Sequence, residues 1–80
     1  MNDVELKVRE ILKNNTDLTM PVEEIDAAAT LGEYGLNSML YIKIVVEIES
    51  EFEIEFEDEK LDMRSLSTIK GLVEYITEKI

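Results

Sequence analysis

Residues 38–51, SMLYIKIVVEIESE, constrain the fold more than any other part of the sequence. Four of its polar side chains recur at the helical intervals i, i+4, i+7 and i+8, and most of the other positions are apolar: Lys43, Glu47, Ser50 and Glu51. This spacing predicts one helix whose apolar arc is wider than a single core face of a small domain requires. A chain of 80 residues has room for one core, which predicts a single domain over residues 1–80.

The apolar arc of this helix divides into a face and a flank. The connected face is predicted to enter the core: Tyr41, Ile44, Val45, Ile48 and Phe52. The flank, Met39, Ile42 and Val46, is predicted to stay partly open for a partner or ligand, and burial in the core is the alternative for each of these residues.

Two further helices are predicted near the ends of the chain. Val4, Val8, Ile11 and Leu12 form an apolar stripe, with Asn2 as the expected N-cap and Glu5 as its capping-box partner. The segment NNTD ends this helix. A last helix is expected over residues 68–80, TIKGLVEYITEKI, with Ser67 as its cap. Gly71 weakens that helix unless another helix packs closely against it.

The segment between the first two helices, residues 14–37, shows no sustained period. Pro21 is expected to open a single helical turn over PVEEI. The apolar residues of the segment are expected to attach it to the core: Val22, Ile25, Leu31 and Leu36. A connection this long in a small domain is usually functional.

Residues 51–57, EFEIEFE, alternate as a β-strand does, but no second alternating segment exists to pair with them. We therefore expect a frayed helix end and an extended loop with Phe52, Ile54 and Phe56 turned inward, and a strand is the alternative. A short helix is expected over residues 57–63, EDEKLDM. The predicted fold is an all-α four-helix bundle, with three main helices, one short helix and a long first loop.

Composition excludes several kinds of function. The chain has no cysteine and no histidine, and 19 acidic against 8 basic residues give a net charge of −11. Such a surface repels phosphate backbones, so we expect basic protein surfaces as partners and no nucleic acid. No apolar run approaches the length of a membrane span, and MNDVELKVRE lacks the apolar core of a signal peptide. A monomer in the cytoplasm, without membrane attachment, is expected.

Ser38 is predicted to lie at the start of the central helix, with Asn37 as the cap and Gly35 freeing the turn before it. A nucleophilic serine needs a base, and Lys43 lies roughly 140° further around the helix. The sequence also lacks the G-x-S-x-G motif of serine hydrolases. Residues 57–63 lack the spacing and the glycine of an EF-hand, so no metal site is predicted. The remaining alternatives for Ser38 are an ordinary helix-start hydroxyl and a site modified by another enzyme.

Residues 33–39, EYGLNSM, resemble the [DE]-x-G-L-[DN]-S-[LM] signature of acyl and peptidyl carrier proteins. Chain length, acidity, the long first loop and the closing STIKGLVEYI extend this resemblance over essentially the whole chain. It implies a non-catalytic carrier that receives 4′-phosphopantetheine from coenzyme A through a separate phosphopantetheinyl transferase. The reactive thiol then comes with the cofactor, so no protein base is needed.

Carried over by position, the resemblance implies that Ser38 bears the arm and that Gly35, Leu36 and Asn37 form its setting. It also implies that the central helix contacts partner enzymes, which would load, condense or adenylate the cargo. The residues implied for that surface are Met39, Ile42, Val46 and Glu47.

Three departures from the family pattern bear on the pathway. Asn37 stands where the family most often has Asp, MLYIK replaces the acidic turns typical of fatty-acid-synthesis carriers, and the segment between Phe56 and Ile69 is longer. We therefore expect a specialised carrier of acyl, aryl or aminoacyl groups in a polyketide-like or nonribosomal-peptide-like pathway. The alternatives are a housekeeping acyl carrier protein of fatty acid synthesis and, in another class, an unmodified acidic interaction module.

Overall fold

The computed structural model describes residues 3–80. Within them, the α-helices are α1 (Asp3–Asn15), α2 (Ser38–Phe52) and α3 (Ile69–Lys79). Short 3-10 helices lie between them: η1 (Val22–Glu24), η2 (Leu31–Tyr34) and η3 (Asp58–Leu61). Residues 3–80 contain no strand, and η3 takes the place of the predicted short helix. The predicted all-α bundle of three main helices and one short helix is confirmed.

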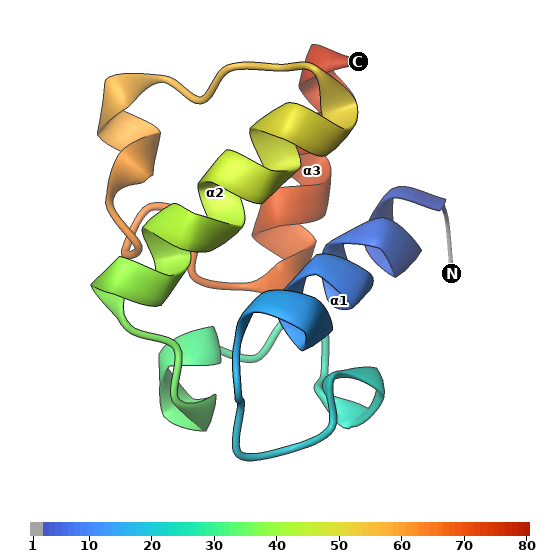
Figure 1. The fold of residues 1–80 in the computed structure, drawn as a ribbon, viewed down its shortest axis with the longest axis vertical. Coiled ribbons are helices and arrows are strands. Elements are labelled where there is room, and N and C mark those ends of the chain that lie inside the picture. The colour runs from blue at the N-terminus through green and yellow to red at the C-terminus, as the bar shows by residue number, and fades with distance from the viewer. Residues whose placement is uncertain (1–2) are drawn as a thin grey trace.

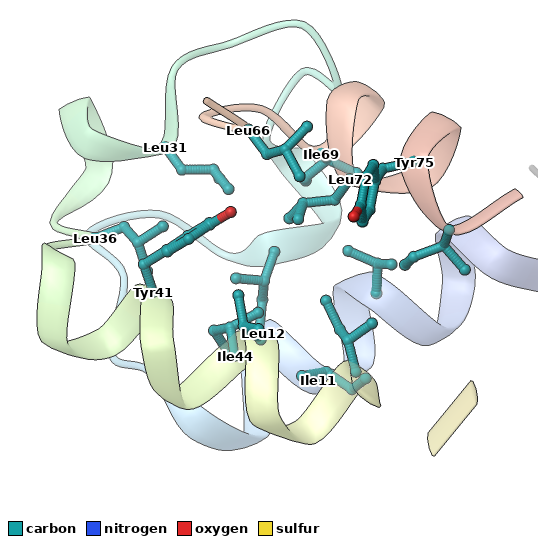
Figure 2. Close-up of a cluster of buried hydrophobic side chains, with 14 of the residues drawn as sticks. Ile11, Leu12, Leu31, Leu36, Tyr41, Ile44, Leu66, Ile69, Leu72 and Tyr75 are labelled. Atoms are coloured by element: carbon teal, nitrogen blue, oxygen red, sulfur yellow. The ribbon is translucent and has the colours of Figure 1, made fainter. Parts of the chain in front are cut away.

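The helices enclose one apolar core, because α1 packs against both α2 and α3 (Figure 1). Side chains from the three helices and from the long first loop converge there, as Figure 2 shows. The largest of the fully buried side chains is Tyr41, from α2. Its predicted companions Ile44, Val45 and Ile48 are also buried, whereas Phe52 at the end of α2 is only half-buried. No helix among the described residues is long and apolar enough to cross a bilayer.

The predicted helix starts are confirmed in one case and wrong in another. The Asn37 side chain caps α2, as expected. Ser67 does not cap α3; the cap is Thr68, whose Oγ1 accepts a hydrogen bond of 2.9 Å from the Gly71 N–H. The carbonyl of Ser67 instead accepts a hydrogen bond of 2.8 Å from the Leu31 N–H, which holds this residue outside the helix. The expected cap at Asn2 lies outside the described residues.

Gly71 is the third residue of α3 and donates its N–H to Thr68, and its surroundings differ from those predicted. A Cβ at this position would lie 3.2 Å from Oγ1 of the capping Thr68 and 3.6 Å from Cδ2 of Leu66. The neighbours that favour glycine here are therefore the cap and the preceding loop, not another helix.

The long first loop is fastened to the rest of the fold at several points. Its apolar residues are buried, as predicted: Val22, Ile25, Leu31 and Leu36. Besides the contact between Leu31 and Ser67, the Lys70 N–H donates to the Ala27 carbonyl at 2.9 Å, which joins the loop to the start of α3. Pro21 precedes η1 and is not its first residue, so the predicted turn exists but begins one residue later.

Arg9 holds the same loop from α1, a role that its sequence position did not suggest. Arg9 is charged and buried, with 8% of its surface exposed. Nη1 donates to the carbonyls of Val22 at 2.6 Å and Ile25 at 2.8 Å, and Nε and Nη2 pair with the Glu5 carboxylate. A buried guanidinium needs such partners because an unpaired buried charge is very costly.

The second connection, between α2 and α3, is extended but forms no strand. Phe56 is buried against Tyr75, with ring centroids 4.9 Å apart, and Ile54 is half-buried, which confirms the inward direction predicted for these residues. Side chains replace a strand partner: the Phe56 N–H donates to Glu49 Oε2 at 2.8 Å, and the Glu57 N–H donates to the Tyr75 hydroxyl at 3.0 Å. The strand alternative is therefore wrong, because the backbone finds its acceptors elsewhere.

Candidate functional site

The turn before α2 sets the position of Ser38. η2 ends at Tyr34 and is followed by its C-cap, Gly35, whose φ of 104° lies in the left-handed region that glycine adopts without strain. The next residue, Leu36, is buried with 4% of its surface exposed and attaches the turn to the core. The chain therefore reverses at Gly35 and is anchored at Leu36 immediately before the helix begins.

Asn37 then starts the helix. Its backbone is extended, with φ −123° and ψ 177°, and its Oδ1 accepts a hydrogen bond of 2.9 Å from the Leu40 N–H. The cap satisfies one of the amide groups that a helix start leaves without an intrahelical partner. Ser38 is consequently the first residue of α2, and it is exposed.

A surface hollow lies beside Ser38, between α2 and the segment that contains η3. Figure 1 shows this segment, in orange, next to α2. The described residues that line the hollow are Ser38, Ile42, Leu61, Asp62, Met63 and Arg64. Half of these residues are apolar, and the others provide a hydroxyl, a carboxylate and a guanidinium.

The two charges in the hollow are paired with each other. Arg64 donates from Nη2 to Asp62 Oδ2 at 2.8 Å and from Nε to Oδ1 at 3.2 Å, and its backbone N–H donates to the same Oδ1 at 2.9 Å. The hydrogen bonds from the Arg64 side chain and backbone lower the pKa of the Asp62 carboxyl to about 2. A carboxylate this weakly basic cannot take a proton from a serine hydroxyl at neutral pH.

The surroundings of Ser38 therefore do not form a nucleophilic enzyme site. The chain contains no histidine, Asp62 is a poor base, and Lys43 does not line the hollow. No group of residues within 3–80 is arranged to hold a metal ion. What the geometry offers is an exposed hydroxyl at a capped helix start, beside a surface hollow.

The flank of α2 is exposed next to this hydroxyl. The exposed fractions are 83% for Met39, 41% for Ile42 and 54% for Val46, and Glu47 is also exposed. The core alternative for the three apolar residues is therefore wrong. A second hollow continues along α2, shares Ile42 and Leu61 with the first, and also includes Val46.

Tyr41 also shapes the site, although the sequence placed it only in the core. Its buried hydroxyl donates to the Lys60 carbonyl at 2.7 Å, which ties η3 to α2 next to the hollow. Burial, followed by the nearby charge of Asp62, raises the pKa of the Tyr41 hydroxyl to about 12, so it stays a donor at neutral pH. No local pattern reveals a partner 19 residues away, so this contact could not be predicted.

A comparison with known protein families identifies the family to which this chain is similar. Residues 4–76 match the family described as the phosphopantetheine attachment site. The chain belongs to this family of carrier proteins. The group that the family carries is 4′-phosphopantetheine, and the exposed Ser38 hydroxyl beside a partly apolar hollow is compatible with such an attachment.

Relatives of both acyl and aminoacyl type are similar to the carrier over most of its length. An acyl carrier protein of Buchnera aphidicola is 34% identical over 80 residues, covering 99% of this chain and 96% of the relative. An aminoacyl carrier protein of Agrobacterium fabrum is 35% identical over 69 residues, covering 86% of this chain and 83% of the relative.

The chain is also similar to a solved structure. The carrier superposes with a TM-score of 0.85 and 32% identity on a chain in the crystal structure of an engineered Bradyrhizobium japonicum glycine:[carrier protein] ligase complexed with a carrier protein from Agrobacterium tumefaciens and ATP. The match covers 94% of this chain and 97% of the other chain, so the matched chain has the size of a carrier.

Proposed function

We propose that Ser38 bears the 4′-phosphopantetheine arm and that the domain carries thioester-bound groups between partner enzymes. The observation that supports this most is the position of Ser38, which is exposed at the first residue of α2 in a chain that matches the attachment-site family. When bound, the arm supplies a thiol that forms a thioester with the cargo. The protein itself is a non-catalytic carrier.

The roles of the neighbouring residues follow from their contacts. Gly35 permits the reversal of the chain, Leu36 anchors it in the core, and Asn37 fixes the first turn of α2. Together they hold the Ser38 hydroxyl at the surface, where a separate phosphopantetheinyl transferase can reach it. The free amides at the helix start also favour the negative charge that the modification introduces.

Intact-mass measurement tests the attachment. The purified protein is incubated with coenzyme A and a promiscuous phosphopantetheinyl transferase, and we expect a mass gain of one phosphopantetheine group. Ser38→Ala should abolish the gain, whereas Ser50→Ala, which removes another exposed serine from the same helix, should retain it. No gain in the wild type would favour an unmodified interaction module, whereas a gain that persists in Ser38→Ala would show that the arm is attached to another residue.

We further propose that an adenylating enzyme loads the arm with an aminoacyl or related group in a specialised pathway. Two observations support this: the similarity to an aminoacyl carrier protein and to the carrier-sized chain in a ligase complex, and a first turn of α2 without acidic residues. The surface proposed for partners is the exposed flank of α2, formed by Met39, Ile42 and Val46. Glu47 is also exposed and is proposed as a charged contact of this surface. An acyl carrier protein of fatty acid synthesis is the second candidate, because the Buchnera acyl carrier protein is equally similar.

Loading experiments distinguish the two pathways. We expect the phosphopantetheine-bearing protein to gain the mass of a glycyl group with an aminoacyl-[carrier protein] ligase, ATP and glycine. Val46→Ala should raise the KM of that ligase for the carrier while leaving the fold intact, since the side chain is exposed. Loading by a malonyl transferase of fatty acid synthesis, together with no glycyl transfer, would support the second candidate.

A further inference from the structure

The hollow beside Ser38 contains one cation among the residues that line it, Arg64. We propose that Arg64 is a positioning residue that binds the phosphodiester through which the arm is joined to Ser38. This inference rests on the attachment of the arm to Ser38, as proposed above. It assigns to Arg64 a contact with the first group of the arm, close to the protein surface.

The geometry of Arg64 suits it to this role. Two hydrogen bonds to Asp62, at 2.8 and 3.2 Å, hold the guanidinium through Nη2 and Nε, and Nη1 lies outside this pair. The Arg64 side chain is 87% exposed, so its outer N–H groups can approach an incoming ligand. A guanidinium can bind two oxygens of a phosphate in parallel, and one that is already oriented loses less conformational freedom on binding.

The distribution of charge points to the same residue. The chain carries a net charge of −11, which makes an added phosphodiester unfavourable over most of the surface. Next to Ser38, however, the first turn of α2 has no acidic side chain, and Asn37 is neutral. The carboxylate in the hollow, Asp62, already accepts hydrogen bonds from Arg64 at both oxygens. Arg64 is therefore the group in the hollow that can stabilise the new charge.

Such a contact would restrain the arm near its attachment point. The apolar residues that line the hollow with Arg64 are Ile42, from α2, and Leu61 and Met63, from the segment that carries Arg64. With the phosphodiester bound by Arg64, the first bonds of the arm would leave Ser38 toward this hollow, between α2 and η3. The contact is exposed, so salt should weaken it.

Phosphorus NMR of the phosphopantetheine-bearing protein tests the proposal. The modification is first verified by intact mass, because absence of a mass gain would refute the attachment itself. In modified samples, Arg64→Gln should shift the 31P resonance from its wild-type position, and added salt should move the wild-type resonance in the same direction. The Arg64 Nε–H resonance of the wild type should also shift when the arm is added.

Lys43→Gln is the matched control, since it removes one positive charge from an exposed residue of α2 that does not line the hollow. This variant should keep the wild-type 31P position. Arg64→Gln should fold normally because the side chain is exposed, and its amide spectrum verifies this. A 31P resonance that is the same in wild type and in Arg64→Gln, with the mass gain present in both, would overturn the role of Arg64 and leave the attachment intact.

Discussion

The two sides of α2 have nearly the same chemistry and opposite environments. On one side, four apolar side chains have at most 1% of their surface exposed: Tyr41, Ile44, Val45 and Ile48. On the other, Met39, Ile42 and Val46 are between 41% and 83% exposed. The helical period identifies the whole arc as apolar, but the packing of the neighbouring elements divides it. The buried side stabilises the domain, and the exposed side is free to contact partners.

Adjacent valines test this difference most strongly. Val45 is 1% exposed and Val46 is 54% exposed, and replacement by alanine removes the same atoms from the same helix. Val45→Ala should reduce the free energy of unfolding by about 2 kcal/mol, because buried methyl groups are lost and a cavity remains. Val46→Ala should change it by less than about 0.5 kcal/mol. Urea unfolding of both variants measures the contrast, and equal losses would contradict it.

The Tyr41 hydroxyl connects the buried side of α2 to η3. Tyr41→Phe removes its hydrogen bond to the Lys60 carbonyl and should reduce the free energy of unfolding by about 1 kcal/mol. Amide hydrogen exchange in residues 58–61 should become faster, since η3 loses a contact with α2. An unchanged exchange rate would show that other contacts are sufficient to hold η3.

Asn37 tests whether the helix start depends on a side-chain oxygen or on charge. Asn37→Ala should cost about 0.5–2 kcal/mol, because the Leu40 N–H loses its acceptor. Asn37→Asp keeps the oxygen and should leave thermal stability nearly unchanged. Thermal unfolding followed by circular dichroism compares the three proteins. Equal stability in all three would show that the cap contributes little.

The smallest expected effect concerns Asp62, beside the exposed flank. Arg64 lowers the pKa of the Asp62 carboxyl to about 2, below its ordinary value of roughly 3.9. The contribution of the pair to stability is therefore present above the ordinary pKa and is lost as the pH falls toward the lowered one. In Arg64→Gln the pKa should rise toward its ordinary value, as carboxyl carbon NMR over the folded pH range would show. The same low pKa in the variant would exclude the Arg64 side chain as the cause, since Arg64→Gln keeps only the backbone hydrogen bond to Asp62.

Much of the fold follows from local patterns. The apolar periods predicted α1, α2 and α3, and the sequence around Gly35 and Asn37 predicted the turn and the cap before Ser38. These features depend on residues a few positions apart, whose effects can be read along the chain. The prediction for the cap of α3 was wrong by one residue, because Ser67 and Thr68 are both suitable caps. In the structure Thr68 is the cap, and the Ser67 carbonyl is bonded to the Leu31 N–H.

Contacts between distant segments could not be predicted in this way. Arg9 reaches two loop carbonyls 13 and 16 residues away, and Tyr41 reaches one 19 residues away. In each case a side chain donates a hydrogen bond to a backbone carbonyl. Every residue has such a carbonyl, so the sequence does not indicate which residue is the acceptor. The hollow that joins Ser38 to Arg64 is of the same kind, because its two sides are far apart in the chain.

The sequence by itself therefore determined the three helices, the presentation of Ser38 and the resemblance to carrier proteins, since these rest on short-range periodicity, capping and a local motif. The sequence also separated a core face of α2 from a flank, but only the tertiary structure decided that the flank is exposed and not buried, and which charged group lies beside Ser38. The physical reason is that burial depends on the elements that pack against a surface, and their positions follow from the whole fold.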